Sequence, residues 1–133
     1  MRYLLDTNIL SQVAKHPQGM LAKRIKKLGD SKCCTSVIVA CEMAFGAETR
    51  KSTKISERIS RALATVTILD MPKGVSVHYA RIRTALEASG KPIGSNDLLI
   101  AAHAIHANLT LVSDNSCEFD RVPGLKLENW LRD

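Results

Sequence analysis

Four acidic residues stand at positions where they could act together, in a chain whose overall charge is positive. Asp6 follows the apolar segment YLL, Asp114 follows LTLVS, Asp97 heads the apolar run DLLIAAHA, and Glu42 interrupts VIVACEMAFGA. Clustered carboxylates repel one another and raise each other's pKa unless a cation neutralises them. If these side chains meet, their oxygen ligands favour a hard divalent cation, Mg2+ or Mn2+, over zinc.

The elements that must position these acids follow from the hydrophobic pattern. Short segments without polar alternation predict strands buried on both faces of a parallel sheet, at 3–5, 33–36, 66–70 and 109–113, with a last short strand in 125–130. The segments between them have helical periodicity, at 8–15, 20–28, 37–49, 52–65, 76–89 and 97–108. Strands that alternate with helices predict an α/β fold with a mostly parallel sheet, in one domain spanning residues 1–133.

Several boundary residues support this assignment. Pro17 must end the first helix, and Ser36 or Thr35 can cap the helix that contains Glu42. Gly29 closes the amphipathic segment 20–28. That segment is expected to place its apolar side chains on one face, namely Met20, Leu21, Ile25 and Leu28.

Three of the acids are predicted to share one edge of the sheet. Asp6 and Asp114 follow parallel strands, and ligands of open α/β sheets bind outside the carboxyl ends of the strands. Asp97 begins a helix that runs antiparallel to the following strand, so its N-terminus returns to the edge where Asp114 lies. We therefore expect the three carboxylates to converge there.

Glu42 is the fourth candidate. A charged side chain among apolar neighbours is costly to bury unless it is paired or faces a polar cavity. It lies too far from its helix N-terminus to act as a cap, and it shares a face with Phe45 and Gly46. We expect Glu42 to face a cleft.

Each acid also has a purely structural interpretation. Asp6 can cap a helix, and Asp97 can interact with the macrodipole of its own helix. Asp114 can belong to a turn, and Glu42 can pair with a lysine. The predicted meeting of all four in an otherwise basic chain favours a cation site.

The positive charge is concentrated in the N-terminal half. The net charge is +6, and residues 15–61 hold 11 Lys and Arg against 4 Asp and Glu. Such a segregated surplus favours a partner rich in phosphate, although a solubilising helix surface explains it equally well. With only five aromatic residues, a platform that stacks bases is not expected.

Other chemistry has weaker support. The four cysteines show no C-x-x-C spacing and are expected to be buried, reduced side chains of a cytoplasmic protein. No signal peptide or membrane-spanning run is expected, and no nucleotide-binding glycine motif is present. His103 and His106 are assigned to helix packing or to the surface. Ser95 and Ser113 lie beside the acids and can orient water or a ligand.

The quoted motifs together resemble the PIN-domain ribonucleases and, within them, the VapC toxins of bacterial toxin–antitoxin pairs. The resemblance covers nearly the whole chain, in the order YLLDTNIL, SVIVACEMAFGA, GKPIGSNDLLIAAHA, LTLVSDN and EFDRVPGLKLENW. It implies a three-layer α/β/α sandwich with a central parallel sheet and an acidic pocket that binds Mg2+ or Mn2+.

By motif position, the resemblance assigns metal binding to Asp6 and Asp97 and the second acid to Glu42. Asp114 stands where the family accepts Asp or Asn. Asn115 and Glu118 lie near the pocket in relatives and are weaker candidates.

The primary hypothesis is metal-dependent hydrolysis of RNA, in which the cation activates a water and polarises the phosphoryl oxygen. Glu42 acts as a ligand or as a general base, and Lys and Arg of the 20–61 region hold the RNA backbone. One alternative is a catalytically silent module that binds RNA or protein. A phosphatase with Asp6 as nucleophile is disfavoured, because Asn8 replaces the second acid which that chemistry uses.

The resemblance further implies partners. A VapB-type antitoxin is expected to cover the pocket, and the toxin is expected to form a homodimer. Operator DNA would be bound only indirectly, through the antitoxin. The substrate is an RNA, with tRNA among the candidates. The amphipathic segments 20–28 and 53–64 are candidate docking surfaces, although a core-facing stripe produces the same pattern.

Overall fold

The structure is a computed structural model that describes residues 1–132 and contains one five-stranded parallel sheet. The strands are β1 (Tyr3–Leu5), β2 (Cys33–Ser36), β3 (Thr67–Leu69), β4 (Thr110–Val112) and β5 (Leu127–Glu128), in the order β3-β2-β1-β4-β5. In the central strand β1, Leu4 lies opposite Cys34 on one side and Leu111 on the other. Every residue of β1 is buried, as expected for a parallel strand covered on both faces.

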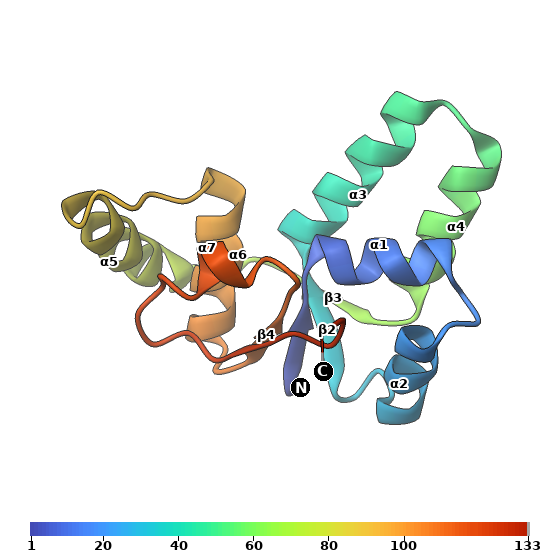
Figure 1. Ribbon diagram of the computed structural model, residues 1–133, viewed down its shortest axis with the longest axis horizontal. Helices are drawn as coiled ribbons and strands as arrows, with labels where there is room; N and C mark the ends of the chain where they lie inside the picture. Colours follow the sequence, from blue (N-terminus) through green and yellow to red (C-terminus); the bar gives the residue numbers. More distant parts are fainter. Residues whose placement is uncertain (133) are drawn as a thin grey trace.

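Helices cover both faces of the sheet. They are α1 (Thr7–Lys15), α2 (Met20–Leu28), α3 (Val37–Arg50), α4 (Thr53–Ala64), α5 (Val75–Ala88), α6 (Ser95–His106) and α7 (Ser116–Phe119). Figure 1 shows α1, α2 and α4 on one side of the strands and α5 and α6 on the other. The predicted α/β sandwich is therefore confirmed. The short helix α7 was not predicted, because four residues carry no helical periodicity.

Helix caps fix the chain where the strands end. Asp6 caps α1 by accepting a hydrogen bond from the Thr7 N–H, and Ser36 caps α3 by accepting one from the Ile38 N–H. Gly29 ends α2 with φ = 84°, a conformation that side chains other than glycine's rarely adopt. The acids at positions 6 and 42 thus belong to elements with well-defined beginnings.

Helix α6 is the most buried helix and carries Asp97 in its first turn. His103, on the same helix, is buried, and its Nδ1 lies 3.0 Å from the Ser36 Oγ at the end of β2. Burial lowers the pKa of His103, which favours the neutral imidazole. The predicted packing role of this histidine is confirmed.

Two expectations about burial were wrong, both for cysteines. In α2, Met20 has 88% of its surface exposed, and the face that packs on the core is formed by Ile25 with its partly buried neighbours. Cys33 and Cys34 are buried as expected, but Cys41 and Cys117 are exposed.

Residues 1–132 include no helix that is both long enough and apolar enough to cross a membrane.

Candidate active site

An open cavity of about 410 Å3 lies at the carboxyl ends of the strands, and we call it the acid cavity. Its walls come from α1 along its whole length with the preceding Asp6, the middle of α3, the first turn of α6 and the segment after β4. The lining residues are Asp6, Thr7, Asn8, Ser11, Gln12, Lys15, Glu42, Asp97 and Asn115. Three of the four predicted acids therefore meet at this edge of the sheet.

Asp6 is the most buried of these acids, with 4% of its surface exposed. Burial raises the pKa of Asp6, and the charges of Glu42 and Glu118 raise it further. Two hydrogen bonds oppose this shift, from the Ser113 Oγ to Asp6 Oδ2 at 2.7 Å and from the Thr7 N–H to Oδ1 at 2.8 Å. Asp6 is consequently fixed in orientation, while its negative charge remains poorly compensated.

Glu42 reaches the cavity from the middle of α3. The Thr7 hydroxyl donates a hydrogen bond to Glu42 Oε1 at 2.6 Å, which links α3 to the first residue of α1. Phe45, expected on the same face, is 70% exposed and does not line the acid cavity. Glu42 therefore faces the cleft as predicted, held by a neighbouring hydroxyl and not by a lysine.

Asp97 has the most perturbed acidity in the cavity. Partial burial, a hydrogen bond shared with Glu118, and the charges of Glu118, Asp6 and Glu42 together raise the pKa of Asp97 to about 8. The N-terminus of α6 favours the ionised form, but its effect is outweighed by burial and by three neighbouring carboxyl groups. Asp97 is therefore the group that holds a proton when no cation is present.

Glu118 in α7 is the partner of this protonated aspartate. The hydrogen bond shared with Asp97 lowers the pKa of Glu118, and the Gly94 N–H, 3.2 Å from Oε1, lowers it further. The Asn115 Nδ2 also donates to Oε2. Within the pair, a proton therefore binds more readily to Asp97 than to Glu118.

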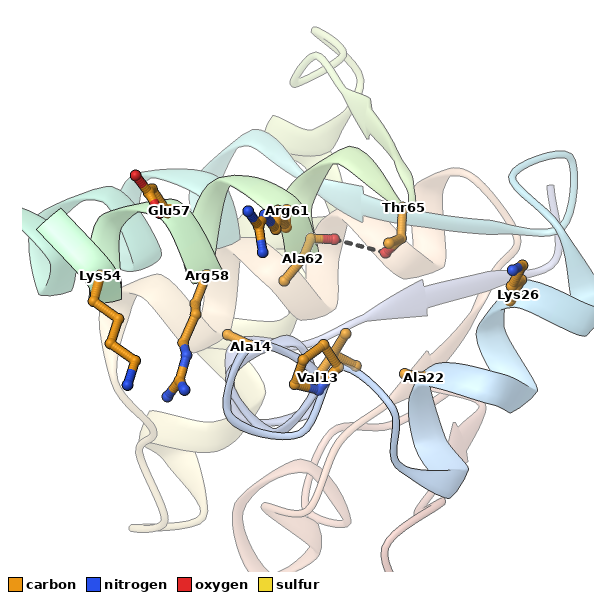
Figure 2. Close-up of a pocket in the computed structure, with 11 residues that line it drawn as sticks. Val13, Ala14, Ala22, Lys26, Lys54, Glu57, Arg58, Arg61, Ala62 and Thr65 are labelled. Atoms are coloured by element: carbon orange, nitrogen blue, oxygen red, sulfur yellow. Dashed lines mark hydrogen bonds between the residues drawn. The ribbon is translucent and has the colours of Figure 1, made fainter.

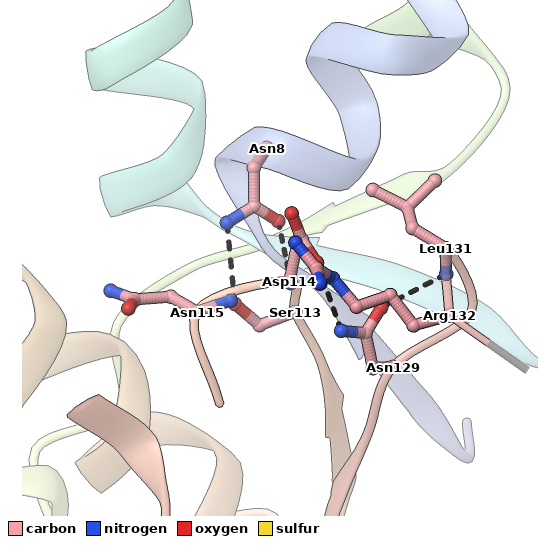
Figure 3. A network of polar contacts seen from close by, with 7 residues as sticks. All are labelled: Asn8, Ser113, Asp114, Asn115, Asn129, Leu131 and Arg132. Atoms are coloured by element: carbon pink, nitrogen blue, oxygen red, sulfur yellow. Dashed lines mark hydrogen bonds and ion pairs between the residues drawn. The ribbon is translucent and has the colours of Figure 1, made fainter. Parts of the chain in front are cut away.

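Asp114 does not line the acid cavity, although it follows the strand next to that of Asp6. Its Oδ1 accepts hydrogen bonds from Asn129 Nδ2 and from Arg132 Nε, both at 2.9 Å, and these lower the pKa of Asp114 (Figure 3). The carboxylate therefore ties the C-terminal segment to the end of β4. The expected convergence of four acids is met by Asp6, Glu42 and Asp97, and Glu118 takes the place expected for Asp114.

Asn8 connects the Asp114 segment with the cavity (Figure 3). Its Oδ1 accepts a hydrogen bond from the Asp114 N–H at 3.0 Å, and its Nδ2 lies 3.4 Å from the Ser113 Oγ. The same hydroxyl donates to Asp6, so a polar chain runs from the C-terminal segment to the most buried carboxylate. Ser113 thus orients an acid, whereas the sequence had suggested that it orients water or a ligand.

The cavity chemistry fits a hydrated hard cation. Within residues 1–132, no three His, Cys, Asp or Glu side chains lie close enough together to hold one ion. Magnesium, however, keeps several waters and is commonly bound by one or two carboxylates. Asp6 and Asp97 line one open cavity with raised pKa values, and a cation would relieve the unfavourable charge.

Sequence reasoning did not identify the supporting groups Thr7 and Asn8. The residues that they contact, Glu42 for Thr7 and Asp114 for Asn8, lie 35 and 106 positions away along the chain. Glu118 was a weaker candidate from the resemblance, but its pairing with Asp97 has no local signal, because the two residues belong to different helices.

Comparison with known proteins identifies the family. The PIN domain model matches residues 3–125. The chain is 38% identical to ribonuclease VapC2 of Rickettsia felis, with 98% of each chain covered. It is 40% identical to ribonuclease VapC2 of Haemophilus influenzae, covering 98% of this chain and 99% of the relative. Identity to the tRNA(fMet)-specific endonuclease VapC of Shigella flexneri is 32%, with 98% of each chain covered.

Solved structures agree with this assignment. The fold matches VapBC2 of Rickettsia felis, bound to a DNA fragment from its promoter, with a TM-score of 0.88 and 36% identity over 98% of this chain and 99% of that chain. It matches the DNA-bound VapBC of Salmonella typhimurium with a TM-score of 0.86 and 31% identity over 98% of each chain. With an acid cavity at the carboxyl edge of a parallel sheet and similarity over nearly its whole length, this chain belongs to the PIN-domain family and, within it, to the VapC ribonucleases.

Proposed function

We propose that this protein is an endoribonuclease that hydrolyses RNA phosphodiester bonds in the presence of Mg2+ or Mn2+. The observation that carries the proposal is the meeting of Asp6, Glu42 and Asp97 in one open cavity, with the pKa of Asp97 raised to about 8. Repulsion between these carboxylates does not stabilise the fold, whereas a hydrated cation bound among them would.

Asp6 and Asp97 are the proposed metal-binding residues. A divalent cation at this position would supply a Lewis acid for the phosphoryl oxygen and lower the pKa of a water molecule. Asp6 is already oriented by Ser113 and Thr7, so little reorganisation is needed on binding.

Glu42 is proposed to accept a proton from the attacking water or to act as a further ligand. The Thr7 hydroxyl occupies Oε1, which orients the carboxylate and leaves Oε2 for the water. Asp114, which sequence reasoning grouped with the catalytic acids, is proposed to act indirectly: its backbone N–H holds Asn8, and its side chain holds the C-terminal segment.

The family also suggests the biological setting. We propose that the protein is the toxin of a VapBC-type pair in the cytoplasm and that a VapB-type antitoxin covers the acid cavity. The relatives named tRNA(fMet)-specific endonucleases make tRNA a reasonable first substrate. A homodimer, and contact with operator DNA only through the antitoxin, complete the proposal.

Cleavage of purified cellular RNA by the antitoxin-free protein tests the activity. We expect cutting with Mg2+ or Mn2+, none after chelation by EDTA, and none with Asp97→Asn. Sequencing the fragment ends would identify the target. If the wild-type protein binds the RNA tightly and leaves it intact with either metal, the silent binding module is correct and the nuclease proposal is not.

A further inference from the structure

Two more cavities continue from the acid cavity along α1. The first holds about 170 Å3 and shares Ser11 and Lys15 with the acid cavity. The second holds about 660 Å3, lies between α1, α2 and α4, and shares Ala14 and Arg58 with the first. Because each cavity shares lining residues with the next, the three adjoin one another, and together we call them the α1 depression. Their order runs from the acids along α1, whose nine residues span about 13 Å.

The walls of this depression are basic beyond the acids. We call its six cationic residues the basic track: Lys15, Lys26, Arg50, Lys54, Arg58 and Arg61. Figure 2 shows Lys54 and Arg58 extending from α4 alongside Val13 and Ala14 of α1. All six residues of the track are exposed.

The charges of the track are not neutralised by the fold. Within residues 1–132, no residue of the track forms an ion pair, and Glu57 is the one acid among the described residues that line the two cavities. Lys54, Arg58 and Arg61 follow one another at helical spacings of four and three and share one face of α4 with a single acid, Glu57. Three cations against one acid leave this face with a net positive charge, and an anionic ligand would reduce the repulsion between the cations.

A polyanion that reaches the acid cavity needs such a surface. The carboxylates of Asp6, Glu42 and Glu118 repel phosphate groups. Binding of RNA there therefore requires cationic side chains that contact the phosphates of the flanking nucleotides. The basic track, which begins at Lys15, offers such side chains on one side of the acid cavity. The phosphates of a single-stranded RNA backbone can bind along a positively charged groove, so single-stranded RNA matches the charge of the basic track.

We propose that the basic track binds the phosphates of the RNA segment on one side of the scissile bond, so that the substrate runs from the acid cavity along α1 toward α4. The inference rests on the proposed nuclease function and extends it by assigning the path of the substrate. The occupant is single-stranded RNA, and recognition depends on charge and not on base identity.

A charge-removal variant tests this assignment. The variant Arg50→Gln/Lys54→Gln/Arg58→Gln changes residues that line the first or second cavity, or both, and leaves the acid cavity untouched. The matched control, Lys32→Gln/Lys73→Gln/Arg81→Gln, removes the same charge from exposed positions outside the track. Thermal melts check that both variants fold.

Kinetics should separate the two variants. With a mixed-sequence single-stranded RNA, the track variant should raise KM about tenfold or more and leave kcat within about twofold, since phosphate contacts outside the reacting group contribute uniform binding. A trinucleotide, too short to reach the track, should be cleaved equally by all three proteins. The slope of log binding constant against log salt should fall by about 2 for the three lost contacts.

Binding to the non-cleaving Asp97→Asn protein separates this proposal from the nuclease proposal. If the wild-type protein cuts nothing and RNA binding to Asp97→Asn still depends on Arg50, Lys54 and Arg58, the nuclease proposal is wrong and the assignment of the basic track to RNA is supported. Equal losses in track and control variants would overturn the track in favour of a general positive field. If the track variant binds RNA as before but no longer binds a poly-glutamate peptide, the proposal would be overturned in favour of an acidic protein partner.

Discussion

Asp6 and Asp114 lie at the carboxyl ends of neighbouring parallel strands and have opposite environments. Because Leu5 lies opposite Val112, Asp6 is level with Ser113, and Asp114 lies one residue farther along the chain. Asp6 is buried among other carboxyl groups and its pKa is raised. Asp114 is hydrogen-bonded to Asn129 and Arg132 and its pKa is lowered.

The comparison shows what a position at the sheet edge does and does not determine. The edge brings acidic residues within one region, but the partners of each carboxylate decide its use. An acid without a compensating cation is poised for a metal or a proton, whereas an acid with an arginine is already neutralised. The predictions below test this division, beginning with the largest expected effect.

Removing charge inside and outside the cavity should have very different effects on cleavage. Asp97→Asn should lower the rate of RNA cleavage by more than about 100-fold, beyond the 10- to 100-fold that is typical of residues that only orient ligands. Asp114→Asn keeps an oxygen for Asn129 and Arg132, and should lower the rate by less than about tenfold. Initial rates at saturating Mg2+ measure both. Similar losses in the two variants would abolish the distinction.

Glu118→Gln should alter the pH dependence of cation binding. The Glu118 charge and hydrogen bond help raise the pKa of Asp97 to about 8, so a neutral partner that can donate to an ionised Asp97 lowers it. Because the cation competes with the proton, Mn2+ affinity near pH 7 should increase, and its pH dependence should move to lower pH. Titration calorimetry across pH 6 to 9 measures the shift. An unchanged profile would exclude Glu118 as the partner.

The cation-free stability of the two regions should respond oppositely to substitution. Because the pKa of Asp97 is raised in the folded protein, its contribution to the free energy of unfolding is fully present below pH 3.8, the ordinary pKa of the side chain. That contribution is lost as the pH rises to about 8. At pH 8 to 9, Asp97→Asn should therefore raise Tm by a few degrees, about the effect of 1 kcal/mol. Thermal melts in EDTA measure it, and added Mg2+ should stabilise the wild-type protein alone.

Asp114 provides the contrast in sign. Because the pKa of Asp114 is lowered in the folded protein, its contribution to stability is present above the pKa of the unfolded state. That contribution is lost as the pH falls through the pKa of the folded state. Asp114→Asn should therefore lower Tm near neutral pH, and the difference from wild type should shrink in acid. If Asp114→Asn instead raised Tm as Asp97→Asn does, the two carboxylates would share one environment.

The smallest effect is expected at the exposed end of the C-terminal network. The Arg132 side chain is 76% exposed, and ion pairs of this kind contribute little. Arg132→Gln should change the cleavage rate by less than about twofold and leave the pH profile unchanged. A larger loss, measured beside Asp114→Asn, would mean that the C-terminal segment controls the cavity through Asn8.

The sequence predicted the elements well where local chemistry is decisive. The strand at 3–5 and the end of a helix at Gly29 each depend on a few neighbouring residues, and both were confirmed. Of the two candidate caps of α3, Thr35 and Ser36, the structure has Ser36. Cys41 and Cys117 were predicted to be buried from their apolar type, but they are exposed, because burial depends on which helix face a distant element covers.

For the candidate site, the sequence by itself determined which residues could bring negative charge to the carboxyl edge of a parallel sheet. Strand ends and helix starts are local features, and parallel topology brings them to a common edge. It thereby predicted that Asp6, Glu42, Asp97 and Asp114 meet, and the structure brings the first three into one cavity.

Only the tertiary structure decided the partners of each acid. Three contacts show this, and each joins residues from different segments of the chain: Thr7 with Glu42, Asp97 with Glu118, and Asp114 with Arg132. A hydrogen bond depends on distances of a few tenths of an ångström, which periodicity and composition do not encode. The same limit applies to the basic track: the sequence shows an excess of cations, and packing of α4 on α1 aligns them beside the acids.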